Sequence, residues 1–268
     1  MHATEQDPPL ELQAEFNYRM AVSRLLAGAI NHGLDTNALL CDAGMNPAAI
    51  EGDGDVSRSQ YINLLTSLLP PLQDEFFGLR EHPVKPGVTS MMVEIALGND
   101  TLGAAMTQSL RFMRLVCDDM RMSLSDEGDD IALVLAGLDP QRDPGHFLVD
   151  YWLNYLHRVF SWMIDQLIPV KAVELAFSEN VNPERLVYQL RGDWQSDCKR
   201  NAVVFSRKYL SLPILRSRNE WLALRQTAIQ SGVVHWPDEQ VQVSSKVRSL
   251  VFNALRQGEA IPILNTVA

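Results

Sequence analysis

Apolar residues recur at intervals of three and four positions through most of the first 120 residues, which is the spacing of one face of an α-helix. Capping residues and glycine or proline stops set the boundaries of the predicted helices, which cover residues 15–32, 37–43, 57 or 59 to 69, 90–97 and 102–118. Pro70-Pro71 is expected to end the third of these, because proline has no N–H to donate within a helix. Residues 1–14 are predicted to form an irregular amino-terminal segment, the lead, which precedes this mainly helical part.

The period then changes from helical to alternating. Residues 120–125 alternate and residues 131–136 are apolar, with Glu127-Gly128-Asp129-Asp130 between them, which predicts a β-hairpin with a four-residue loop. A long apolar helix is expected over residues 146–168. Further alternating stretches predict strands over residues 172–177, 186–190 and 202–206. This order of elements predicts an α+β fold in which helices cover an antiparallel sheet.

The carboxyl-terminal part is expected to form a helix, a linker and the start of another helical unit. The helix over residues 219–230 packs either on a partner protomer or on its own domain, and the pattern does not decide between them. Apolar positions from Val243 to Leu255 form a helical stripe that Gly258 ends, and Ile261-Pro262 opens a further helix. The predicted segments are a lead over 1–14, a main domain over 15–218, a helix and linker over 219–240, and a helical remnant over 241–268.

Composition and charge limit the range of functions that the chain could have. The 268 residues are 46% hydrophobic and 21% charged, which excludes disordered, collagen-like and coiled-coil proteins. The formal net charge of −10 argues against nucleic-acid binding by the chain as a whole, because phosphate contacts require basic patches. The charge is uneven, however: residues 241–268 hold three basic residues and one acid, a net of +2, so residues 1–240 carry −12.

The cysteines and the amino terminus indicate the compartment. Cys41, Cys117 and Cys198 are far apart and form no metal-binding or paired motif, which is typical of a reducing environment. The acidic amino terminus lacks the basic start and apolar stretch of an export signal. The longest clean apolar run, residues 131–138, is far shorter than the ~20 residues that cross a bilayer. We therefore expect a cytoplasmic protein that does not insert into membranes.

Catalytic and metal chemistry find little support in the residue pattern. Acid pairs at 118–119, 126–127 and 129–130 surround the predicted hairpin without EF-hand spacing, so we interpret them as a solvated turn. His157 falls on the polar arc of the long helix with no second ligand at helical spacing, which favours a surface residue over a haem ligand. Neither GxSxG nor a glycine-rich phosphate loop occurs. We therefore predict that the protein is not an enzyme and uses no metal or cofactor.

One group of large side chains fits either a plain core or a ligand-contacting surface. Tyrosine and tryptophan carry polar tips that need partners when buried, and small-molecule sites are mostly apolar with a few such groups. If an effector binds, we expect it between the long helix and the sheet. The candidate contacts are Met91, Met92, Phe112, Tyr151, Trp152 and Tyr155.

Several short segments carry a family resemblance when they are taken together. They are residues 33–45 (GLDTNALLCDAGM), 77–80 (FGLR), 99–105 (NDTLGAA), 112–116 (FMRLV), 173–177 (VELAF), 201–205 (NAVVF) and 210–213 (LSLP). In this order, within residues 15–218, they resemble the arabinose-binding-like amino-terminal domain of one subgroup of the AraC/XylS family of bacterial transcription regulators. The segment 190–198 departs from that family, which usually carries Phe-Gly-x-Pro there, so a pocket inferred from the family need not extend to it.

The carboxyl end resembles the same family. Residues 243–258 and 261–268 are similar to the first helix of its DNA-binding domain and to the opening of its first helix-turn-helix motif. The second helix of such a motif reads bases in the major groove, so we interpret the chain as truncated before its recognition helix. The resemblance implies promoter DNA as a partner through the missing carboxyl-terminal domain, a homodimer and, where an effector exists, a small molecule.

Two functions remain open at this point. In the first, the chain is the effector-sensing and dimerising part of a regulator, in which a ligand that prefers one conformation changes how two DNA-binding domains are presented. In the second, it is a stand-alone small-molecule or protein-binding module without a DNA partner. The reading frame beyond codon 268 distinguishes them, because only the first requires further helix-turn-helix sequence.

Overall fold

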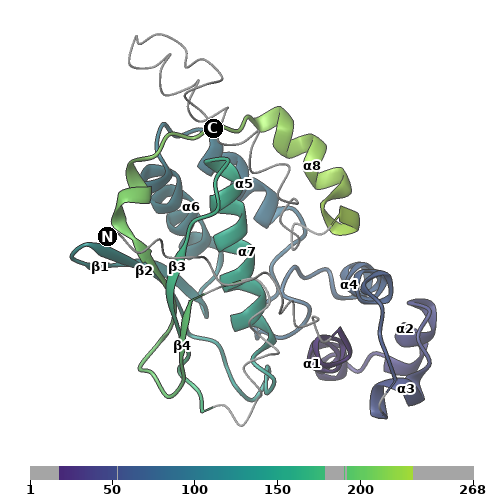
Figure 1. Ribbon diagram of the computed structural model, residues 1–268. Coiled ribbons are helices and arrows are strands. Elements are labelled where there is room, and N and C mark those ends of the chain that lie inside the picture. The colour runs from purple at the N-terminus through teal and green to yellow at the C-terminus, as the bar shows by residue number, and fades with distance from the viewer. Residues whose placement is uncertain (1–17, 53, 179–189, 191, 232–268) are drawn as a thin grey trace, which may run out of the picture.

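A mixed sheet and a long central helix organise the molecule. The computed structural model describes residues 18–52, 54–178, 190 and 192–231. Helix α7 (Phe147–Met163) has the five-stranded sheet on one side and the amino-terminal helices on the other (Figure 1). The predicted α+β fold with helices against a sheet is therefore confirmed. The predicted lead, the strand over 186–190 apart from Leu190, and everything predicted beyond Ser231 lie outside the described residues.

Local caps explain where the amino-terminal helices begin. These helices are α1 (Tyr18–Asn31), α2 (Thr36–Asp42), α3 (Pro47–Glu51) and α4 (Arg58–Leu72). The Asp35 carboxylate caps α2, and Ser57 with Gln60 forms a capping box at the start of α4. The periodicity did not predict α3, which is too short to show a stripe and is instead marked by an Asn46 cap followed by Pro47.

The predicted stop at Pro70-Pro71 is wrong. Both prolines lie inside the last turn of α4, which continues to Leu72. Proline holds φ near the helical value, and this close to the carboxyl end its missing N–H removes only the last intrahelical bonds. Gln73, in the left-handed conformation with φ 49°, ends the helix and donates its N–H to the Leu69 carbonyl at 2.9 Å.

The middle of the chain follows the predicted order of helices and strands, except that the predicted strand over 186–190 lies outside the described residues apart from Leu190. The elements are α5 (Val88–Leu97), α6 (Leu102–Val116), β1 (Arg121–Glu127), β2 (Asp130–Ala136), β3 (Val170–Glu174), β4 (Asp193–Gln195) and β5 (Asn201–Ser206). The sheet order is β1-β2-β5-β3-β4, and all neighbours are antiparallel except β3 and β4. Leu133, Val173 and Val203 belong to the same buried core as the apolar side chains of α6 and α7.

Three details of this region differ from the prediction. In the hairpin Glu127 pairs with Asp130, so the loop has two residues rather than four, and its Gly128 has φ 78°, which costs glycine little. Helix α7 ends at Met163 instead of residue 168. The N–H groups of Asp165 and Gln166 donate to the carbonyls of Trp162 and Ser161 in a turn, and the Ile168 N–H donates to the Ser161 hydroxyl. Strand β4 was not predicted, because three residues at a sheet edge are too few to show an alternation.

The last described elements are a 3₁₀ helix, η2 (Arg207–Ser211), and helix α8 (Arg218–Ser231). Helix α8 packs against α4 and α5 of its own chain, and its Trp221 is buried. Of the two packings that the sequence left open, the structure therefore shows the one on its own domain. None of the described helices combines the length and the hydropathy needed to cross a membrane.

Candidate functional site

Helix α7 carries three of the predicted contact residues in one aromatic cluster. The rings of Tyr151 and Tyr155, one turn apart, are nearly parallel with centroids 6.1 Å apart. The ring of Trp152 meets them edge-on, at 5.9 Å from Tyr151 and 5.4 Å from Tyr155. Pairs with these geometries stabilise a fold by about 0.5–1.5 kcal/mol beyond the burial of their surface.

The remaining rings come from the start of α7 and from the segment between α4 and α5, which we call the 74–80 segment. Phe76 stacks on Trp152 at 4.6 Å, and Phe77 meets Tyr151 edge-on at 5.4 Å. Phe147 contacts both Tyr151 and Phe77, at 5.7 Å and 6.0 Å. The aromatic cluster, as we name these six residues, thus joins α7 to the 74–80 segment, and not to the sheet as expected from sequence.

A buried carboxylate and two glycines hold the 74–80 segment in place. Asp74 is 2% exposed, and its carboxylate accepts hydrogen bonds from the N–H groups of Phe76, Gly78 and Val84 at 3.0, 2.9 and 2.7 Å. On the other side, the backbone of Gly78 lies directly against that of Gly28 in α1. The position of Phe76 and Phe77 is therefore fixed by backbone contacts and does not depend on ring packing alone.

Glu75 places a negative charge beside the two tyrosines. Its carboxylate accepts from the N–H groups of Gly87 and Thr89, at 2.6 and 2.7 Å, and so anchors the start of α5. Burial raises the pKa of Tyr151, and the Glu75 charge raises it further. The pKa of Tyr155 is also raised, first by burial and then by Tyr151 and Glu75. Both phenols are therefore neutral hydrogen-bonding groups at physiological pH.

Trp152 contributes a fully enclosed polar atom to the cluster. The residue is 1% exposed, and within the described residues its indole Nε1–H has no hydrogen-bond acceptor. A buried donor without an acceptor costs roughly 1–3 kcal/mol, so such groups are uncommon in folded proteins. Trp152 is therefore a buried hydrogen-bond donor left unpaired within the described part of the chain.

The other predicted contacts are placed differently. Met92 is fully buried in the same hydrophobic core, and Phe112 on α6 is partly buried against that core. Met91, the residue before Met92 in α5, is 50% exposed and lies outside the core. The structure thus brings Tyr151, Trp152 and Tyr155 together and leaves Met91 apart.

Four residues at this site were not predicted from the sequence: Glu75, Phe76, Phe77 and Phe147. Two adjacent phenylalanines next to acidic residues show neither helical nor alternating spacing, so no periodicity marks them. Phe147 belongs to the stripe of the long helix, and only its contact with Phe77 distinguishes it from other core residues.

The interpretation of His157 as a surface residue is wrong. Its side chain is 3% exposed, and Nε2 lies 2.7 Å from the Ile168 carbonyl oxygen, to which it donates. Arg158, Ser161 and Asp165 on the same polar arc are also buried. Sequence periodicity identifies a polar arc but not what covers it, and here the chain that follows α7 folds back over that arc.

Burial of His157 predicts a pH dependence of stability. Burial lowers the pKa of its imidazole from the ordinary 6.5 to about 4. Between these values the unfolded chain binds the proton and the folded chain does not, so stability should decrease as pH falls from 6.5 toward 4. The expected loss is up to about 3 kcal/mol, from 1.36 kcal/mol per pKa unit.

Urea unfolding of wild type and His157→Gln at pH 7, 6, 5 and 4 checks this expectation. Glutamine does not titrate and still offers an N–H to the Ile168 carbonyl, so its stability should vary less over this range than that of wild type. Parallel pH profiles for the two proteins would contradict a neutral, buried imidazole.

Acidic residues around the hairpin form ion pairs with basic residues from the start of η2 and from β3. Asp126 binds Arg207, and Asp130 lies 2.6 Å from the Lys171 ammonium. A hydrogen bond from the Gly128 N–H, and then one from Arg207, lower the pKa of Asp126. Among the described residues no group of three or more His, Cys, Asp or Glu side chains is placed to hold a metal ion.

Comparison with known families adds one finding. Residues 33–214, which include the 74–80 segment, α7 and all five strands, match the family model described as the arabinose-binding domain of AraC transcription regulators, N-terminal. None of the curated proteins compared with the chain matches it.

Proposed function

Because the chain belongs to the family of amino-terminal arabinose-binding domains of AraC transcription regulators, we propose that residues 15–218 sense a small-molecule effector and dimerise within such a regulator. The family is one of regulatory ligand-binding domains and not of enzymes. Promoter DNA would be contacted through the domain that begins near residue 241, which accords with the change of net charge from −12 to +2 at that point. A regulator of this type acts in the cytoplasm.

We place the effector at the aromatic cluster. The observation that carries this choice is the enclosed Trp152 N–H without an acceptor, next to the phenols of Tyr151 and Tyr155. An apolar surface with a few convergent polar groups is what small ligands bind, and the acceptor that Trp152 lacks is what a ligand supplies. The cluster also joins α7 to the 74–80 segment. A ligand that binds one relative arrangement of these two parts more tightly would favour that arrangement.

A thermal-shift screen of metabolites on the 268-residue protein tests the proposal. A ligand present at 100 times its dissociation constant stabilises the folded state by about 2.7 kcal/mol, which raises the melting temperature by roughly 5–10 °C in a domain of this size. Trp152→Phe keeps a ring but removes the N–H, so it should weaken binding of such a ligand by roughly tenfold.

The matched control is Trp194→Phe on the edge strand β4, whose indole N–H already donates to the Leu190 carbonyl at 3.3 Å. This variant should bind the ligand as tightly as wild type does. A ligand with equal affinity for wild type and Trp152→Phe would place the effector elsewhere, and a broad screen without any stabilising compound would count against an effector role.

A further inference from the structure

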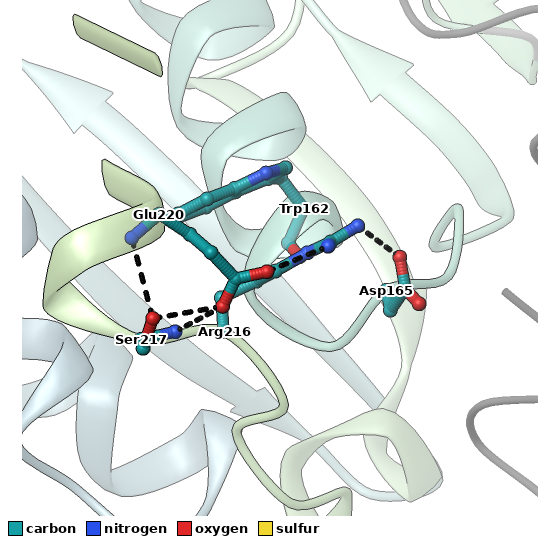
Figure 2. Close-up of polar contacts among 5 residues, drawn as sticks. All are labelled: Trp162, Asp165, Arg216, Ser217 and Glu220. Atoms are coloured by element: carbon teal, nitrogen blue, oxygen red, sulfur yellow. Dashed lines mark hydrogen bonds and ion pairs between the residues drawn. The ribbon is translucent and has the colours of Figure 1, made fainter. Parts of the chain in front are cut away.

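One arginine links the carboxyl end of α7 to the amino end of α8. The backbone N–H of Leu215 donates to the Met163 carbonyl at 2.8 Å, and the side-chain Nε of Arg216 donates to the Trp162 carbonyl at 3.3 Å. Both carbonyls lie in the last turn of α7, where the Trp162 carbonyl also accepts from the Asp165 N–H at 3.0 Å. A cation at this end of a helix is favoured by the helix dipole. The Arg216 side chain therefore caps the carboxyl end of α7 (Figure 2).

The same guanidinium binds one carboxylate from the turn after α7 and one from α8. One of its terminal nitrogens pairs with Asp165, which is 3% exposed, and the other lies 3.1 Å from Glu220 in the first turn of α8 (Figure 2). Glu220 in turn accepts from the N–H and hydroxyl of Ser217 and donates its own N–H to that hydroxyl, which forms a capping box. Burial would raise the pKa of Glu220, but the hydrogen bonds from Ser217 and Arg216 outweigh it and lower that pKa.

Two tryptophans pack beside this ion pair. Trp162 of α7 and Trp221 of α8 lie 5.9 Å apart, and the Arg216 guanidinium sits over the Trp162 ring at 5.6 Å. A cation over an indole face adds to the attraction where water is partly excluded. The start of α8 is therefore held to the end of α7 by both charge and ring contacts.

A second set of contacts holds the side of α8 to α5. The Trp221 indole N–H and Arg225 both donate to the Ser90 hydroxyl, at 3.1 and 3.0 Å, and Arg218 pairs with Glu94 at 2.6 Å. Residues 218, 221 and 225 lie on one face of α8, and residues 90 and 94 are one turn apart on α5. The orientation of α8 is thus defined by α5 and α7 together.

We propose that Arg216 is a positioning residue that couples α7 to α8, so that a change at the aromatic cluster alters the attachment of α8. The regulatory meaning of this coupling rests on the proposed function, since α8 leads to the residues expected to enter the DNA-binding domain. Tyr155 and Trp162 are two turns apart on one face of α7, so the cluster and the Arg216 contacts share a single rigid element.

Geometry favours arginine over any other cation at this position. The guanidinium offers a planar fork whose separate nitrogens reach Asp165, Glu220 and the Trp162 carbonyl together. A lysine ammonium has the charge but acts as a single point, so it cannot hold both carboxylates in the same way. Arg216→Lys should therefore behave more like Arg216→Met than like wild type.

Hydrogen exchange of the 268-residue protein, followed by mass spectrometry without any ligand, tests the coupling. In Arg216→Met the amides of α8 should exchange at least roughly tenfold faster than in wild type, while those of α2 and β2 stay unchanged. The matched control is Arg200→Met, because Arg200 also bridges two carboxylates, Glu174 and Glu127, but on the sheet. It should leave α8 unchanged.

A second variant tests the link to the cluster. Tyr155→Ala should accelerate exchange in α8 in the wild-type background and add little in the Arg216→Met background, because the coupling is already lost there. Additive effects, unchanged α8 exchange in Arg216→Met, equal acceleration throughout the chain, or full rescue by Arg216→Lys would each overturn the proposal. None of these readouts uses an effector or DNA, so they are independent of whether the proposed function holds.

Discussion

Replacing Gly28 with alanine should lower the free energy of unfolding by about 4 kcal/mol or more, beyond the usual range for overpacked sites. A Cβ at this position of α1 would lie 1.7 Å from the Phe77 carbonyl oxygen, far inside contact distance. That oxygen belongs to backbone, and the neighbouring amides are tied to Asp74, so it has little freedom to move away. Helix α1 and the 74–80 segment would have to separate.

Chemical denaturation of Gly28→Ala checks this result, with Gly98→Ala as the control. At Gly98, which has negative φ and follows α5, the nearest atom to an added Cβ is the Ile95 carbonyl oxygen at 3.5 Å, an ordinary contact. Its stability should change by less than about 1 kcal/mol. A Gly28→Ala protein as stable as the Gly98→Ala protein would show that α1 and the 74–80 segment are not in backbone contact.

Asp74→Ala should lower the free energy of unfolding by about 4 kcal/mol. The substitution removes one charged acceptor and leaves three buried N–H donors without a partner. The three N–H groups belong to Phe76, Gly78 and Val84, and the Asp74 side chain is buried. Because these bonds shape the segment that carries Phe76 and Phe77, the ring packing on α7 should loosen as well. Near-ultraviolet circular dichroism of the native protein reports that loosening, and urea unfolding reports the stability.

Asp35→Ala provides the comparison for Asp74→Ala. Asp35 also accepts from backbone N–H groups, those of Asn37 and Ala38, but at an exposed helix start where water replaces it. Its loss should cost only about 1 kcal/mol. Equal effects of the two substitutions would contradict a buried anchoring role for Asp74.

The candidate site was only partly accessible from sequence. Tyr151, Trp152 and Tyr155 could be named because they follow helical spacing on a long apolar helix, and aromatic residues with polar tips are informative there. Phe76 and Phe77 could not be named, because about 70 residues separate them from α7 and no local pattern records a contact of that range. Met91 and Met92 also show this limit: they are adjacent in the sequence, but Met91 lies on the surface and Met92 in the core.

The sequence by itself determined the features that depend on neighbouring residues. Helix starts at Ser57 and Thr101 follow from side chains that accept the first free N–H groups, and the order of helices and strands follows from hydrophobic spacing. The ordered segments also determined the family, which the match over residues 33–214 confirms. Tertiary structure alone decided what covers each surface: it buried the polar arc around His157, set Trp152 against Phe76, and used Arg216 to join α7 to α8. The physical reason is that burial and charge pairing depend on contacts between distant parts of the chain, whereas periodicity and capping are local.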